Sequence, residues 1–133
     1  MFFTGVDFLT YETEDRVVGG EPTSRFTKKT LALYNEAMYS DGHCFAVGYS
    51  DLKIGKTVGM PVPGTCSFAG WEGLPNGGVW GVVPVSAKNA AGEWLENNEV
   101  KPDVEVKNQY DVIAKGRDQQ LERAIQELLE DVK

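Results

Sequence analysis

Histidine and cysteine are scarce in this chain. Its 133 residues include one histidine, His43, and two cysteines, Cys44 and Cys66. One histidine and two separated cysteines do not make a ligand set for a metal, and a single cysteine pair is no disulfide framework for a chain of this length. We therefore expect no metal, no cofactor and two buried free thiols.

Long apolar runs and an excess of positive charge are also missing. Apolar runs such as residues 79–85 are far shorter than the roughly 20 residues that cross a bilayer. Residues 1–5 lack the basic and sustained apolar segments of a secretory signal. The formal net charge of −7 would repel a phosphate backbone. The sequence thus predicts no membrane span and no nucleic-acid partner.

What remains is the composition of a soluble globular protein, with 41% hydrophobic and 25% charged residues. A chain of this length is one domain or part of one, so we take residues 1–133 as a single unit. Residues 1–29 show no sustained period and read as an edge or severed element, with a turn at 19–22.

Further along, the pattern predicts a strand, a helix, several strands and a last helix. Residues 30–34 alternate like a strand, Ser40 begins a helix and Gly55 ends it. The strands that follow are expected at 57–58, 66–68, 79–85, 93–95 and 104–106. This order predicts an α/β or α+β fold.

The last helix is expected to be amphipathic, with Asp118 as its N-cap. The apolar stripe comprises Leu121, Ile125, Leu128, Leu129 and Val132, and the outward positions are Gln119, Glu122, Arg123, Gln126 and Glu130. In the middle of the chain, Trp71, Trp80 and Trp94 are expected in the core, with a peptide cleft as the alternative.

Ser40 lies at the start of the predicted helix, a few residues after the predicted strand. Its hydroxyl would be at the positive end of the helix dipole, and the Asp41 N–H would be free to stabilise an oxyanion. These are the requirements of a serine nucleophile. Plain helix capping by Ser40 is the alternative.

Four blocks of the sequence resemble the tricorn-like and C-terminal processing serine peptidases. The first, residues 34–45, contains Ser40-Asp41-Gly42 and resembles the nucleophile segment. The others are residues 55–59 with Gly64-Thr65, residues 96–106, and the final helix from 115 to 125. The resemblance implies the C-terminal portion of a crotonase/Clp-protease-like core, in which ββα units form a spiral.

The resemblance implies catalytic roles for three residues of this chain. The resemblance implies Ser40 as nucleophile, Asp41 N–H as an oxyanion donor and Glu96 as the glutamate of a Ser-His-Ser-Glu tetrad. A solvated acid is the alternative for Glu96. The family's histidine, its second serine and its other oxyanion glycine have no counterpart here, so we expect the chain to begin after them. His43 is expected to be a local hydrogen-bonding residue and not the base.

The resemblance therefore implies part of a serine endopeptidase that acts through an acyl-enzyme on peptides or unfolded protein, completed by the upstream peptidase core. Without its base the chain is expected to be inactive. An extended edge at residues 60–68 is expected to receive the substrate. The alternatives are a non-catalytic peptide-binding or assembly module, and a fragment that pairs with another copy as a homo-oligomer.

Overall fold

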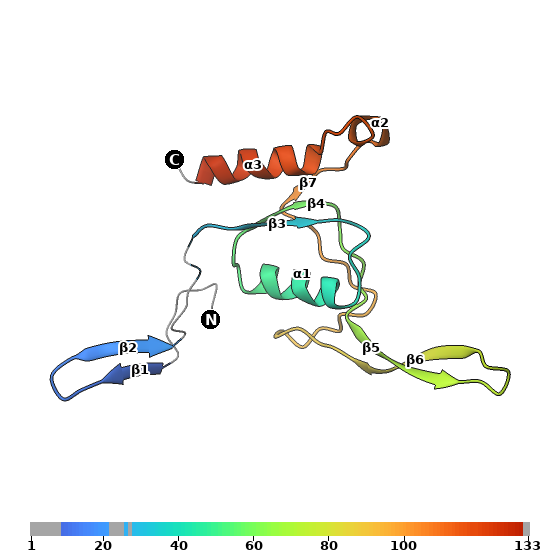
Figure 1. The fold of residues 1–133 in the computed structure, drawn as a ribbon, viewed down its shortest axis with the longest axis horizontal. Helices are drawn as coiled ribbons and strands as arrows, with labels where there is room; N and C mark the ends of the chain where they lie inside the picture. Colours follow the sequence, from blue (N-terminus) through green and yellow to red (C-terminus); the bar gives the residue numbers. More distant parts are fainter. Residues whose placement is uncertain (1–8, 22–25, 27, 132–133) are drawn as a thin grey trace. The chain divides into compact units, whose positions relative to one another are not determined.

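A computed structural model describes residues 9–21, 26 and 28–131 (Figure 1). The chain divides into two compact units, Met1–Thr30 and Leu31–Lys133. The first unit contains an antiparallel hairpin of β1 (Leu9–Glu12) and β2 (Val17–Glu21). Gly19 pairs with Tyr11 and Gly20 with Thr10, so residues 19–21 belong to β2 and do not form the expected turn; residue 22 lies outside the described residues. Polar residues make the turn instead, closed by a 2.9 Å bond from Thr13 N–H to the Arg16 carbonyl.

The second unit is built on a parallel sheet of three strands in the order β3-β4-β7. These strands are β3 (Leu31–Tyr34), β4 (Lys56–Gly59) and β7 (Val104–Glu105). Helix α1 (Asp41–Asp51) lies on one side of the sheet and α3 (Gln119–Asp131) on the other, and the short α2 (Tyr110–Ile113) precedes α3 (Figure 1). The strand expected at residues 30–34 and the helix expected after it are present as β3 and α1, and the fold is of the expected mixed α/β class.

Alternation along β3 explains this arrangement. Ala32 and Tyr34 are buried in a core with Ala46 and Tyr49 of α1, whereas Leu33 is 41% exposed. The buried Tyr34 hydroxyl donates to the Ala46 carbonyl at 3.0 Å. β3 thus packs against α1, the helix that follows Ser40.

Helix α1 ends earlier than Gly55, which corrects the expected stop. Lys53 has a φ of 50° and occupies the left-handed position that glycine usually takes after a helix. Its N–H donates to the Ser50 carbonyl at 3.0 Å, and the Ile54 N–H donates to the Tyr49 carbonyl at 3.2 Å. This pair of bonds is a Schellman motif, which sequence composition did not predict.

The tryptophans are exposed, so their expected place in the core is wrong. β5 (Ser67–Gly73) and β6 (Val79–Ser86) form a separate two-stranded hairpin that projects away from the sheet and α1 (Figure 1). Trp71 is 74% exposed and Trp80 46%. Trp94, 54% exposed, lies in no strand and makes one isolated bridge with Lys88, so the strand expected at 93–95 is also absent.

The last helix is present, and Asp118 caps it by accepting the Leu121 N–H at 3.0 Å. Leu121, Ile125 and Leu129 remain 47–55% exposed, while Gln120, Ala124 and Glu127 are buried. The buried polar residues have partners, since Gln120 Nε2 donates to the Val106 carbonyl at 2.8 Å and Glu127 pairs with Lys56 and Arg123. Leu128 of the apolar stripe is half-buried, so the stripe is only partly covered. Val132 lies outside the described residues.

Candidate active site

Ser40 has a strained backbone, with φ 54° and ψ −119°. It is the second residue of a tight turn from Tyr39 to Gly42, closed by a 2.9 Å bond from Gly42 N–H to the Tyr39 carbonyl. These angles are those of the first central position of a type II′ turn, where glycine is usual because a side chain is strained. The sequence therefore places serine where local propensity disfavours it.

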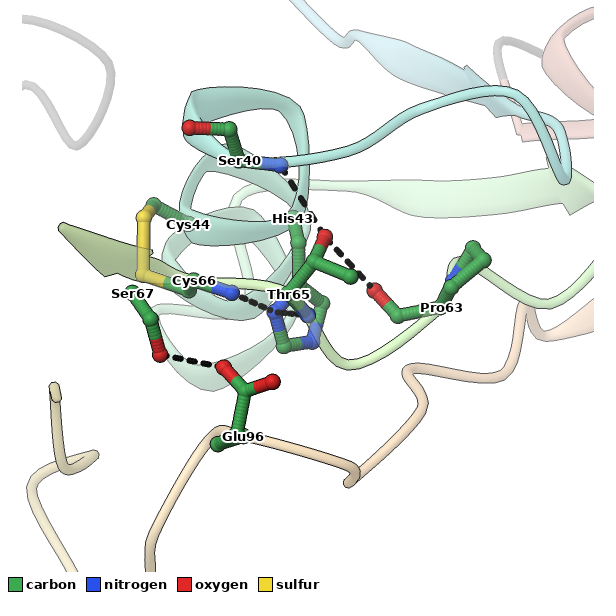
Figure 2. The surroundings of a disulfide bond; sticks show 8 residues. All are labelled: Ser40, His43, Cys44, Pro63, Thr65, Cys66, Ser67 and Glu96. Carbon is green, nitrogen blue, oxygen red and sulfur yellow. Dashed lines mark hydrogen bonds between the residues drawn. A yellow bond between two sulfur atoms is a disulfide. The ribbon is translucent and has the colours of Figure 1, made fainter. Parts of the chain in front are cut away.

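The Ser40 side chain does not cap α1. It makes no capping hydrogen bond, and Figure 2 shows its hydroxyl pointing away from the His43 ring. The Ser40 carbonyl, in contrast, accepts the N–H groups of His43 and Cys44 at 2.9 and 3.1 Å. Among the residues that the structure describes, the Asp41 N–H has no acceptor. A hydroxyl and an amide are thus both left available at this turn.

Thr65 holds the Ser40 backbone from the neighbouring segment. The Ser40 N–H donates to Thr65 Oγ1 at 3.0 Å, and the same hydroxyl donates to the Pro63 carbonyl at 3.3 Å (Figure 2). The residues Gly64-Thr65 belong to one of the blocks that carry the family resemblance. Their contact with Ser40 requires the tertiary structure, since 25 residues separate the two partners.

His43 is fully buried and serves the same segment. Its Nδ1 accepts the N–H groups of Thr65 and Cys66 at 3.1 and 3.0 Å. Burial lowers the pKa of His43, against the raising effects of the Asn98 backbone and the Glu96 charge. A ring that accepts at Nδ1 is neutral and carries its proton on Nε2. His43 is a local hydrogen-bonding residue, as the sequence predicted.

The two cysteines form a disulfide, which corrects the expectation of free thiols. Cys44 of α1 and Cys66 have Cα atoms 5.1 Å apart and are bonded through sulfur (Figure 2). Their separation of 22 residues carries no information on pairing by itself. The fold brings them together because the segment after Pro63 passes along the first turn of α1.

Glu96 lies on the other side of that segment and is half buried. Ser67 Oγ donates to its carboxylate (Figure 2). The next residue, Asn97, has a φ of 61° and donates its N–H to the Gly64 carbonyl at 2.8 Å. A side chain at residue 64 would lie 2.2 Å from the Asn98 nitrogen, so only glycine lets the Glu96 turn pack there.

Thr65 and its neighbours therefore separate the two candidate residues, and no hydrogen bond joins Ser40 to Glu96 in the described part of the chain. Neither residue lines the cavity of about 320 Å³ that Trp94, Asn98 and Val47 border. The sequence did not predict the contacts of Thr65 with Ser40 and of Ser67 with Glu96, although Thr65 lies in one of the blocks that resemble the family. The only sign of these contacts in the sequence was the presence of two hydroxyl side chains, Thr65 and Ser67, close together in one segment.

The edge expected at residues 60–68 is largely occupied. Val62 exchanges two backbone hydrogen bonds with Val100, at 2.9 and 3.0 Å. The amides of Thr65 and Cys66 are used by His43. This segment thus offers a peptide fewer free donors than the sequence suggested.

Residues 9–21, 26 and 28–131 are the part of the chain that the structure describes. No cluster of three or more histidine, cysteine, aspartate or glutamate side chains there is arranged to bind a metal ion. None of the helices in that part of the chain has the length and apolar character needed to cross a membrane.

Known proteins resemble this chain in sequence and in structure. Residues 5–106 match the sequence model of Peptidase family S41. The curated tricorn protease of Thermoplasma acidophilum is 30% identical over 119 residues, which make up 84% of this chain and 11% of that protein. The chain therefore spans only a small part of this relative's length.

Solved structures of peptidases are similar to this chain in fold. The crystal structure of the tricorn protease superimposes with a TM-score of 0.74 at 26% identity, over 95% of this chain and 12% of the other. A putative peptidase from Parabacteroides merdae gives 0.68 at 24% identity, over 86% and 36%. A photosystem II D1 C-terminal processing protease gives 0.54 at 20% identity, over 69% and 24%. Because the family's sequence model covers most of the chain, this protein belongs to peptidase family S41.

Proposed function

We propose that this chain is the nucleophile-bearing, C-terminal part of a serine endopeptidase catalytic domain with a crotonase/Clp-like core. The observation that carries the proposal is the strained Ser40 turn, with φ 54° and an uncapped hydroxyl at the junction of strand and helix. A serine on a strained strand-to-helix turn exposes its Oγ for attack. Strain of this kind costs about 1–3 kcal/mol and typically persists at functional sites.

In the proposed reaction, Ser40 Oγ attacks the carbonyl carbon of a peptide bond and loses its proton to a base. The tetrahedral oxyanion that forms accepts a hydrogen bond from the Asp41 N–H, which lacks an acceptor among the described residues. The C–N bond then breaks, the amine leaves with a proton, and an acyl-enzyme ester remains on Ser40. Water hydrolyses this ester and releases the acid product.

Glu96 is proposed to support the tetrad. Its carboxylate already accepts a hydrogen bond from the Ser67 hydroxyl. Such a carboxylate can in the same way anchor a hydroxyl that orients a histidine, as the tetrad requires. Within residues 1–133 the Ser67 hydroxyl is the group that bonds to Glu96, and the tetrad's second serine is not among them.

In the proposed reaction the base is supplied from outside residues 1–133. The one histidine of the sequence, His43, is buried and its Nδ1 is occupied by two backbone donors. The chain alone is thus expected not to turn over unstructured peptides. The same observation favours the second candidate function, a non-catalytic peptide-binding or assembly module with this fold.

The test uses a fluorophosphonate probe, which labels activated serines, on the chain alone and on the chain joined to an upstream region that supplies a histidine. We expect labelling only in the second case and its loss in Ser40→Ala. Ser86→Ala, at the exposed end of β6, is the matched control and should label normally. Labelling that persists in Ser40→Ala would reject the nucleophile. Labelling of the chain alone at Ser40 would reject the need for an outside base.

A further inference from the structure

Thr65 is connected to the strained turn by a contact that the proposed reaction does not use. Its Oγ1 accepts the Ser40 N–H at 3.0 Å and, as donor, points to the Pro63 carbonyl at 3.3 Å. Because the hydroxyl hydrogen is used by the Pro63 carbonyl, the oxygen remains as an acceptor for the Ser40 N–H. Both capacities of one hydroxyl are therefore used to join two backbone segments.

Thr65 is itself fixed in place by buried contacts. Its N–H and that of Cys66 donate to His43 Nδ1, and Cys66 is tied to Cys44 by the disulfide. The preceding Gly64 packs directly against the backbone of residues 97–98. The hydroxyl is thus presented to Ser40 by a segment with little freedom to move.

A strained backbone persists only where its surroundings hold it. The Ser40 turn has one internal hydrogen bond, between Gly42 and Tyr39, and that bond leaves the Ser40 N–H without a partner inside the turn. Thr65 supplies the missing acceptor. We propose that Thr65 is a positioning residue, whose hydroxyl holds Ser40 in the conformation that presents its Oγ. The importance of Thr65 for catalysis rests on the proposed function. Its effect on the Ser40 backbone does not.

The first measurement needs no substitution. Amide hydrogen exchange, followed by NMR on the intact chain, compares the Ser40 amide with the Asp41 amide, which has no acceptor in the described structure. We expect Ser40 to exchange about tenfold or more slowly than Asp41 after correction for intrinsic rates. Equal exchange at the two amides would overturn the proposal.

Variants then separate the hydroxyl from the side-chain volume. Thr65→Val keeps the shape and removes both hydrogen bonds, whereas Thr65→Ser keeps them. In Thr65→Val we expect Ser40 exchange to accelerate about tenfold and the φ-dependent coupling between the Ser40 amide and Hα protons to change. Thr65→Ser should restore both. Thr57→Val, which removes a similar hydroxyl that binds Asp103, is the matched control and should leave Ser40 unchanged.

Unchanged Ser40 signals in a folded Thr65→Val would contradict the proposal. If that variant fails to fold, the wild-type exchange and the Thr65→Ser spectrum still decide. In the probe-competent joined protein, Thr65→Val should lower kcat with little change in KM. Full activity of Ser40→Ala there would refute the proposed function, while the amide result would stand by itself.

Discussion

At the scale of single residues, His43 is the fully buried titratable side chain of the site. Its Nδ1 accepts two backbone N–H groups at 3.0–3.1 Å, and protonation of that nitrogen would remove both bonds. Burial accordingly lowers its pKa below the usual 6.5. The folded state therefore prefers neutral His43, and the unfolded state binds the proton more readily.

The sign of the pH dependence follows. The stability due to neutral His43 is fully present above about pH 6.5 and is lost as pH falls from there toward the lower folded pKa, by up to about 1.4 kcal/mol per pH unit. We expect urea unfolding between pH 7 and 5 to show this loss. In His43→Asn, whose Oδ1 takes the place of Nδ1, it should be absent.

An equal slope in the two proteins would show that other groups cause the loss. The carboxyls with lowered pKa, those of Asp118, Glu122 and Glu127, act at more acidic pH, because hydrogen bonds and ion pairs keep them ionised in the fold. These carboxyls therefore do not account for a difference in stability between the wild type and His43→Asn from pH 7 to 5.

Ser40 and Thr65 show what sequence can and cannot predict at this scale. A serine followed by Asp-Gly at the start of a helix indicated the position of Ser40 and its free amide neighbour. Its positive φ and its bond to Thr65 depend on a contact across 25 residues, which no local pattern contains. The disulfide was missed for the same reason.

At the scale of elements, the disulfide links α1 to the segment that carries Thr65. It closes a loop across a separation of 22 residues, and a cross-link of this span stabilises a fold by roughly 3 kcal/mol in the chain-entropy account. We expect a reducing agent to lower the free energy of unfolding by about that amount. The measurement is urea unfolding with and without reductant.

The matched control is the chain with both Cys44→Ala and Cys66→Ala, which should unfold at the same urea concentration in either condition. If the wild type is equally insensitive, the bond contributes nothing to the folded state. Reduction should also speed exchange at the Ser40 amide, because the segment that bears Thr65 loses its tie to α1.

Hydrophobic patterning predicted elements better than it predicted their burial. Strands β3, β4, β6 and β7 and helices α1 and α3 were all expected near their observed positions. The tryptophans were assigned to a core because apolar strand residues are usually buried. The β5–β6 hairpin instead pairs with itself, and the Trp71 ring lies against Gly81 of the opposite strand, where a Cβ would be 3.1 Å from the ring.

At the scale of the whole molecule, every contact assigned to the site lies in the second unit. Ser40, His43, Thr65 and Glu96, the disulfide and the parallel sheet all fall within Leu31–Lys133. The β1–β2 hairpin belongs to Met1–Thr30. The expectation that residues 1–29 are an edge or severed element of one domain stays a prediction, as does the single domain over 1–133.

Removal of residues 1–30 tests that division. Because the sheet, α1 and α3 supply the core around Tyr34 and Val58 without the hairpin, we expect residues 31–133 to fold alone. Their NMR spectrum should overlay with that of the intact chain at Ser40, Thr65 and Cys66, and the disulfide should form. An unfolded or shifted spectrum would mean that the first unit completes the domain. The folding unit would then have to be defined with residues 1–30 included.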